Sequence, residues 1–171
     1  ATIAQMARAT VMMGVPTLYV RMLAEPSLTK DAASGMRLFV AGSAPLLPET
    51  FDAWRERTGH TIVERYGMSE TVMLTSNAYH ANDGERIAGT VGKPLPGVQL
   101  RIDSSARPGE IGGIEVRGPN VFKGYWRMPE KTAEEFTADG WFKTGDVGQV
   151  DERGVVTIVG RSKDLIISGG Y

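Results

Sequence analysis

The sequence contains no cysteine and only two histidines, His60 and His80, among its 171 residues. The lack of cysteine excludes disulfide bonds and thiolate metal sites, and two histidines so far apart give no zinc-ligand spacing. A cysteine-free chain fits a reducing compartment, so we expect a cytoplasmic protein.

The sequence also lacks an excess of charge of either sign, with 19 Lys and Arg against 20 Asp and Glu and a net charge of -1. Such a balance gives no basic surface for nucleic acid or anionic lipid. No apolar run approaches the roughly 20 residues of a membrane helix, and the pattern of a signal peptide is missing. We therefore expect neither nucleic acid nor a membrane as a partner.

The composition is otherwise that of an ordinary globular protein, with 42% hydrophobic and 23% charged residues. Up to about residue 83, apolar runs alternate with amphipathic stretches, which is typical of a parallel sheet covered by helices. Phe51 and Trp54 lie three apart and should face the core, and Gly59 should end their helix. We expect strands at 9–13, 37–40 and 61–63, and helices beginning at Pro16 and Pro48.

From about residue 84 the sequence changes to short strands separated by glycine and proline. Residues 114–117 alternate in polarity, residues 151–154 have the composition of a hairpin loop, and 155–159 read as the returning strand. One helix is expected at 129–136. The sequence therefore predicts an α/β fold, in which a layered part precedes a β-rich part.

The first candidate site is the loop made by Gly42, Ser43, Ala44 and Pro45, which follows a predicted strand. Open α/β sheets bind ligands at this edge, and a flat ring could lie on a loop where glycine allows close approach. An ordinary strand-to-helix turn explains the same residues, and on this segment alone that alternative is favoured.

Residues 66–71 place an aromatic ring, a hydroxyl and a carboxylate close together after a predicted strand. The ring of Tyr66 could stack on a base, Ser69 could donate to a phosphate oxygen, and Glu70 is a hard oxygen ligand suited to Mg²⁺. The alternative is a helix start capped by Ser69, with Glu70 favouring the helix dipole. The residues alone do not decide between the two.

Two later segments carry further candidates. Asp146 follows a glycine after a short aromatic run, and its two carboxylate oxygens match the two hydroxyls of a ribose. Arg161 could form paired hydrogen bonds to ribose or phosphate oxygens, and Lys163 lies in a polar break between apolar stretches, as a hinge would. The alternatives are a turn aspartate and a charged surface loop.

The segments 109–119 and 124–126 are rich in glycine, but no helix follows them as it would a phosphate loop. Bulges and tight corners explain glycines that alternate with strand residues. We interpret these segments as scaffold.

Together, the order and spacing of these motifs resemble the adenylate-forming superfamily of acyl-CoA synthetases, peptide-synthetase adenylation domains and luciferases, over nearly the whole chain. The resemblance implies that the loop at 42–45 and Tyr66 sandwich an adenine, that Ser69 contacts the α-phosphate and that Glu70 holds Mg²⁺. It also implies that Asp146 binds the ribose. The residues it assigns to the nucleotide are Gly42, Ser43, Ala44, Pro45, Tyr66, Gly67, Met68, Ser69, Asp146 and Arg161.

The resemblance also implies the domain organisation. Residues 1–83 would be the C-terminal portion of a layered α/β subdomain of the large N-terminal domain. Residues 84–160 would form the β-rich, barrel-like subdomain of that domain. Residues 161–171 would be the hinge to a C-terminal domain, with Lys163 as the pivot. Ala1 opens inside an apparently folded segment and Tyr171 follows a glycine pair, so we expect a longer protein on both sides.

Within the superfamily, the similarity is greatest to malonyl-CoA synthetases, at residues 14–19, 64–71, 86–92, 118–132 and 167–171. It implies that malonate, and methylmalonate as well, is activated with ATP and passed to coenzyme A. Ser69 stands where threonine is commoner. A dicarboxylate needs a cation for its distal end, and Arg21 and Arg65 are candidates. The alternatives are a ligase for fatty or aryl acids and a non-catalytic nucleotide-binding module.

Two elements of the superfamily are not found in this sequence: the phosphate loop rich in serine, threonine and glycine, and the lysine of the C-terminal domain that drives adenylation. The residues present could hold the adenine, the ribose and Mg²⁺. We therefore expect the enzyme to need the remainder of its own chain, and the isolated segment to be inactive.

Overall fold

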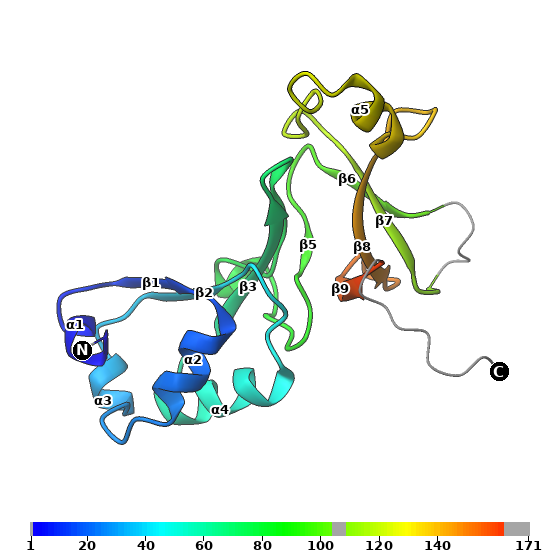
Figure 1. Cartoon of the computed structure of the whole chain (residues 1–171). Helices are drawn as coiled ribbons and strands as arrows, with labels where there is room; N and C mark the ends of the chain where they lie inside the picture. The colour runs from blue at the N-terminus through cyan, green and yellow to red at the C-terminus, as the bar shows by residue number, and fades with distance from the viewer. Residues whose placement is uncertain (1, 104–108, 163–171) are drawn as a thin grey trace, which may run out of the picture. The chain divides into compact units, whose positions relative to one another are not determined.

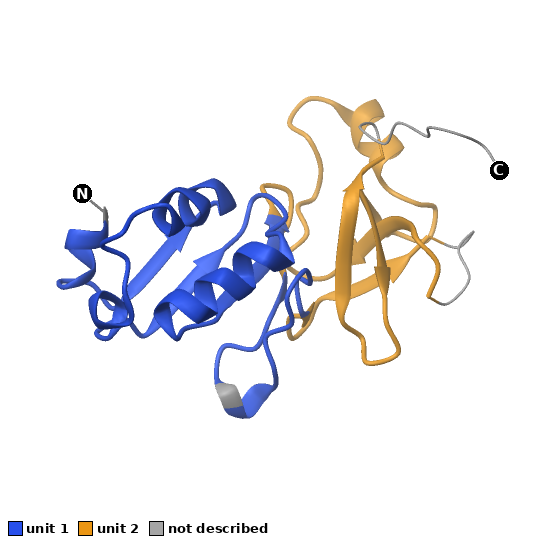
Figure 2. Ribbon diagram, turned by 90° about the horizontal axis from the view of Figure 1, so that it is seen from below, with its two compact units in different colours: residues 1–67, 75–92 blue, residues 68–74, 93–171 orange. Residues whose placement is uncertain are grey.

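The computed structural model describes residues 2–103 and 109–162, which form parts of two compact units (Figures 1 and 2). Unit 1 comprises Ala1–Gly67 and Thr75–Gly92, and unit 2 comprises Met68–Leu74 and Lys93–Tyr171. The chain passes from one unit to the other inside strand β3 (Ile62–Met68).

Unit 1 is built on parallel strands. β1 (Val11–Gly14) pairs with β2 (Leu38–Ala41), which pairs with β3 in the register Ala41↔Glu64. Helices α2 (Pro16–Leu23) and α4 (Pro48–Thr58) lie side by side on one face of these strands (Figure 1). The shorter helices are α1 (Thr2–Met6), α3 (Lys30–Ala33) and the 3-10 turn η1 (Ala81–Asp83).

The helix boundaries follow from local chemistry. Both α2 and α4 begin with a proline, whose fixed φ suits the first helical position and whose missing N–H costs nothing there. Gly59 ends α4 in the left-handed conformation with φ of 79°. The structure thus confirms the predicted helix starts and the predicted stop, and Pro48 marks the end of the loop between β2 and α4.

The core of unit 1 centres on Trp54, which is completely buried. Its ring meets Tyr19 at 4.8 Å and Phe39 at 5.0 Å, both edge to face, which is a favourable aromatic geometry. The Tyr19 hydroxyl donates to the carbonyl of Val40 at 2.7 Å, and burial raises the pKa of that phenol. This core fixes the end of β2 and hence the start of the loop at Gly42.

Unit 2 contains a four-stranded antiparallel sheet in the order β6-β7-β8-β9, with helix α5 (Pro129–Glu135) beside it. Register shifts occur at Gly113/Glu115 and at Val147/Gly148. A Cβ on Gly148 would lie 2.4 Å from the carbonyl oxygen of Thr157, so only glycine fits at that shift. The four strands are β6 (Gln99–Ile102), β7 (Gly112–Arg117), β8 (Phe142–Val150) and β9 (Val156–Arg161).

The predicted α/β fold is confirmed, and the strand predicted at 61–63 is longer than expected. β3 continues to Met68, a turn holds Ser69 and Glu70, and β4 (Val72–Ser76) follows at once. The alternative that Ser69 caps a helix is therefore wrong, because a strand and not a helix follows the turn. β4 and β5 (Lys93–Pro94) complete the order β1-β2-β3-β4-β5. Among the described residues, no helix is long and apolar enough to cross a membrane.

Candidate nucleotide-binding site

The loop of Gly42, Ser43, Ala44 and Pro45 leaves the end of β2 and leads into α4. A Cβ on Gly42 would lie 3.3 Å from the carbonyl oxygen of Arg65, so glycine permits the close approach to β3. Ser43 has φ of 67°, a left-handed conformation that is strained in a residue other than glycine. Residues 43–45 are exposed. The loop therefore offers a fixed, open surface where the parallel strands end.

Glu64 on β3 holds the end of this loop. It was not among the predicted site residues. Its Oε1 accepts a hydrogen bond from the backbone N–H of Leu46 at 2.9 Å, and only 4% of the residue is exposed. Its Oε2 has no hydrogen-bond partner among the described residues. Burial raises the pKa of Glu64 to about 7, against the lowering effect of the bond from Leu46. The available signal was an acidic residue directly after the apolar run Ile62–Val63 of this strand.

Glu64→Gln is expected to remove a pH dependence of stability. The folded-state pKa lies near 7 against an ordinary 4.5. The native state therefore binds the proton more tightly than the unfolded state does. The stabilisation that this proton gives the native state is complete below pH 4.5 and is lost as the pH rises through 7. The pKa shift of Glu64 corresponds to about 3 kcal/mol of that stabilisation. Glutamine keeps the acceptor for the Leu46 N–H but does not ionise. The free energy of unfolding of the variant should therefore rise relative to that of the wild type between pH 5 and pH 8.

The measurement is the free energy of unfolding in urea at pH 5, 6, 7 and 8. The matched control is Glu56→Gln, which neutralises an exposed glutamate on α4. The control should follow the wild type at every pH. Parallel curves for Glu64→Gln and the wild type would contradict the raised pKa.

Tyr66, Gly67 and Met68 belong to β3 itself. Tyr66 is only 8% exposed, so a small part of its ring is open to a ligand. Gly67 and Met68 are half-buried beyond it. Stacking of Tyr66 on a base stays a prediction, and it would use one edge or face of the ring.

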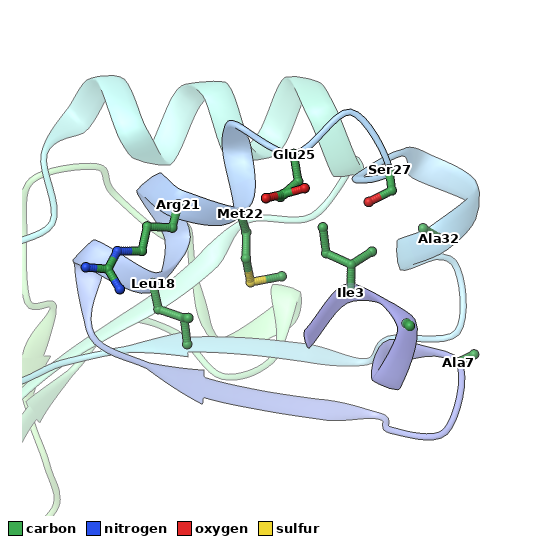
Figure 3. A pocket seen from close by; sticks show the side chains of 9 residues that line it. Ile3, Ala7, Leu18, Arg21, Met22, Glu25, Ser27 and Ala32 are labelled. Carbon is green, nitrogen blue, oxygen red and sulfur yellow. The ribbon is translucent and has the colours of Figure 1, made fainter. Parts of the chain in front are cut away.

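The two candidate arginines lie in different surroundings of unit 1. Arg65 is half-buried on β3, and its Nε has no hydrogen-bond partner among the described residues. Arg21 is exposed on α2 and lines a pocket of about 560 Å³ together with Glu25 and apolar side chains (Figure 3). The acidic Glu25 in the same pocket makes Arg21 the poorer ligand for a second carboxylate.

Unit 2 holds Ser69 and Glu70 on the turn between β3 and β4. Ser69 is exposed and Glu70 is half-buried. The hydroxyl of Tyr125 donates to Glu70 Oε1 at 3.1 Å, and the backbone N–H of Phe122 donates to the Glu70 carbonyl at 2.8 Å. Burial, and then the bond to Glu70, raise the pKa of Tyr125.

Glu70 is suited to one kind of metal site only. Within the part of the chain that the structure describes, no three His, Cys, Asp or Glu residues come together to hold an ion. Mg²⁺ is commonly bound by one or two carboxylates, with substrate phosphates and water completing its shell. A single ordered carboxylate beside the hydroxyl-bearing turn fits that chemistry, and it does not fit a site made of protein ligands alone.

Asp146 and Arg161, predicted separately, are brought together on neighbouring strands. They face each other in the β8–β9 register, and Arg161 Nε lies 3.2 Å from Asp146 Oδ1. The Asp146 side chain is 8% exposed and that of Arg161 is 65% exposed. The ion pair orients the carboxylate while Arg161 stays open to solvent. Lys163, the predicted hinge, lies outside the described residues.

The candidate residues thus comprise a loop at the carboxyl ends of parallel strands in unit 1 and, in unit 2, a half-buried carboxylate on a turn and a buried aspartate paired with an exposed arginine. The sequence profile described as "AMP-binding enzyme" matches residues 1–126. The chain belongs to this family of AMP-binding enzymes.

Three relatives make the comparison more specific. The chain is similar to ATP-bound MatB from Rhodopseudomonas palustris, with 57% identity and a TM-score of 0.93, over 99% of this chain and 34% of that one. It is similar to a malonyl-CoA ligase in a ternary product complex with methylmalonyl-CoA and AMP, with 46% identity and a TM-score of 0.83, over 99% and 38%. It is also 45% identical to a malonate–CoA ligase of Arabidopsis thaliana, over 95% of this chain and 28% of that protein. The chain thus spans about a third of the length of its relatives.

Proposed function

We propose that the protein containing this chain is an acid–CoA ligase that activates malonate, and methylmalonate as well, with ATP and transfers the acyl group to coenzyme A. The observation that supports it most is the agreement with ATP-bound MatB, at 57% identity over 99% of the chain. The absence of cysteine is consistent with a cytoplasmic enzyme.

The proposed reaction has two steps. A carboxylate oxygen of malonate attacks the α-phosphorus of ATP, and the bond to pyrophosphate breaks, which leaves malonyl-adenylate. The sulfur of coenzyme A, having lost its proton, then attacks the acyl carbon, and AMP leaves. The first step brings a carboxylate onto a polyanion, so cationic groups and hydrogen-bond donors must offset the repulsion.

The residues of the chain would divide this work. The loop at 42–45 and Tyr66 would hold the adenine, with Gly67 and Met68 completing the wall. Asp146 would accept from the ribose hydroxyls, with Arg161 fixing its carboxylate. Ser69 would donate to the α-phosphate. Lys163 would be the pivot about which a C-terminal domain turns between the two steps.

Glu70 would hold Mg²⁺ against the phosphates. The bound ion would supply charge neutralisation at the transferred phosphorus. The Tyr125 hydroxyl already donates to one carboxylate oxygen of Glu70, which leaves the second oxygen for a cation.

Arg65 is the preferred partner for the distal carboxylate of malonate. A buried guanidinium nitrogen without a partner is costly, and a carboxylate would satisfy it with a charge-assisted bond. Arg21 remains the second candidate.

Glu70→Gln tests the proposed metal role in the full-length enzyme. The amide keeps the size and the acceptor for Tyr125 but loses the charge. We expect the rate of malonate-dependent pyrophosphate exchange to fall about 10²- to 10³-fold, because charge stabilisation at the phosphorus is lost. Raised Mg²⁺ should restore part of the rate, and the melting temperature should hold.

Glu152→Gln is the matched control, since it neutralises an exposed glutamate of the same unit. It should leave exchange and its Mg²⁺ dependence unchanged. A Glu70→Gln enzyme with normal exchange and a lowered melting temperature would show that Glu70 only supports the fold.

A further inference from the structure

A segment of unit 2 straps down the turn that carries Glu70. The strap is residues 120–125, and it lies about fifty positions along the chain from the turn. The Asn120 Nδ2 group donates to the carbonyls of Thr71 at 2.8 Å and Met73 at 3.2 Å. With the bonds from Phe122 N–H and the Tyr125 hydroxyl to Glu70, the strap holds the turn at its backbone and at its carboxylate.

The backbone of Tyr125 is itself held in place. The N–H of Tyr125 donates to Thr132 Oγ1 at 2.9 Å, and the Thr132 hydroxyl in turn donates to the Met128 carbonyl at 2.9 Å. Gly124 has φ of 146°, and a Cβ there would lie 2.6 Å from Thr132 Cγ2, so the approach of the strap to Thr132 requires glycine.

Aromatic packing joins the strap to the sheet of unit 2. The ring of Tyr125 meets that of Phe122 at 4.8 Å, and Phe122 meets Phe142 of β8 at 5.2 Å, both edge to face. Helix α5 and the strap therefore hold the ring of Tyr125 beside Glu70, and β8 supports it through Phe122.

We propose that Tyr125 is a positioning residue that orients the Glu70 carboxylate toward the metal ion. The inference rests on the proposed metal role of Glu70 and adds a residue to it. A glutamate side chain has three rotatable bonds, and holding it in one direction costs conformational entropy. A bond from a fixed hydroxyl to Oε1 selects the direction of Oε2 before the metal arrives, and a preoriented ligand binds its ion more tightly.

The test is Tyr125→Phe in the full-length enzyme, with Mn²⁺ as the probe. Binding of Mn²⁺ to the complex of enzyme and a non-hydrolysable ATP analogue is followed by electron paramagnetic resonance. The Mn²⁺ dissociation constant should rise about 5- to 20-fold, as for the loss of one charge-assisted bond. The Mg²⁺ concentration for half-maximal pyrophosphate exchange should rise in step, and kcat at saturating Mg²⁺ should stay within about 2-fold of the wild type. Added to Glu70→Gln, the substitution should have no further effect.

Tyr79→Phe is the matched control. It also removes a hydroxyl that meets a charged side chain, that of Arg37, but on unit 1. It should leave Mn²⁺ binding unchanged. Thr132→Val is a second variant, which keeps the Tyr125 hydroxyl and loosens its support, and it should shift the metal dependence in the same direction by less. If Tyr125→Phe is unfolded at the assay temperature, Mn²⁺ binding by Thr132→Val tests the inference in its place.

Two results overturn the inference, and they differ from each other. If Glu70→Gln weakens Mn²⁺ binding while Tyr125→Phe and Thr132→Val do not, Tyr125 has only a structural role and the metal role of Glu70 stands. If Glu70→Gln also leaves Mn²⁺ binding unchanged, the proposed metal role fails, and the positioning role fails with it.

Discussion

The 171-residue chain, purified alone, is expected to show no malonate-dependent pyrophosphate exchange. The phosphate loop and the adenylating lysine that the resemblance implies are not found in the sequence, so the triphosphate and the transferred phosphorus would each lack one group that stabilises their charge. Loss of one preorganised donor commonly costs 10²–10³ in rate, so loss of two such elements should lower the rate by about 10⁴-fold or more. The measurement compares exchange by this chain with exchange by the full-length enzyme.

A folded but inactive chain is distinguished from an unfolded one by its AMP binding. The adenine and ribose contacts proposed for residues 42–45 and Asp146 lie within the chain, so weak AMP binding should remain detectable by calorimetry. The control Glu152→Gln, which removes the charge of an exposed glutamate, should bind AMP equally well. Exchange by the isolated chain near the full-length rate would show that catalysis needs only the residues present, and the proposed mechanism would be wrong.

The helices of unit 1 could be predicted because their signals are local. Pro16 and Pro48 mark the first turns, and Gly59 supplies the left-handed stop. The full length of β3 could not be predicted, since Glu64 and Arg65 interrupt its apolar pattern. Glu64 is tolerated in the buried strand through a bond to Leu46, eighteen residues away, and no local pattern reports such a partner.

The contacts among the candidate site residues could not be predicted from the sequence. The pairing of Asp146 with Arg161 depends on the register of β8 and β9, which shifts at Val147/Gly148. The glycines near residue 113 were interpreted as bulges, and one register shift does occur at Gly113/Glu115. Residues 124–126, interpreted as scaffold, include Tyr125, which reaches Glu70 across 55 positions. Neither the Asp146–Arg161 pair nor the Tyr125–Glu70 bond leaves a periodic signal in the sequence.

Asp146→Ala in the full-length enzyme is expected to weaken ATP binding tens to hundreds of times. If Asp146 accepts hydrogen bonds from both ribose hydroxyls, its truncation removes two bonds to a charged acceptor, which together contribute on the order of 2–4 kcal/mol. The ion pair with Arg161 adds to the effect, because an arginine without its partner no longer holds this corner of the site in place. The expected reading is a raised Michaelis constant and dissociation constant for ATP, with the constant for malonate little changed.

Asp146→Asn and Asp151→Asn separate the ribose role of Asp146 from a role in the fold. Asp146→Asn keeps the shape and one acceptor oxygen, so it should bind ATP with an affinity between those of the wild type and Asp146→Ala. Asp151→Asn removes the charge of an exposed aspartate in the hairpin between β8 and β9, where Asp151 pairs with Arg153. That control should leave ATP affinity unchanged. Since 2′-deoxy-ATP lacks one of the two hydroxyls, the wild type should bind it more weakly than ATP, whereas Asp146→Ala should bind the two nucleotides almost alike. An Asp146→Ala enzyme that keeps the full preference for ATP over 2′-deoxy-ATP would show that Asp146 does not contact the ribose and only pairs with Arg161.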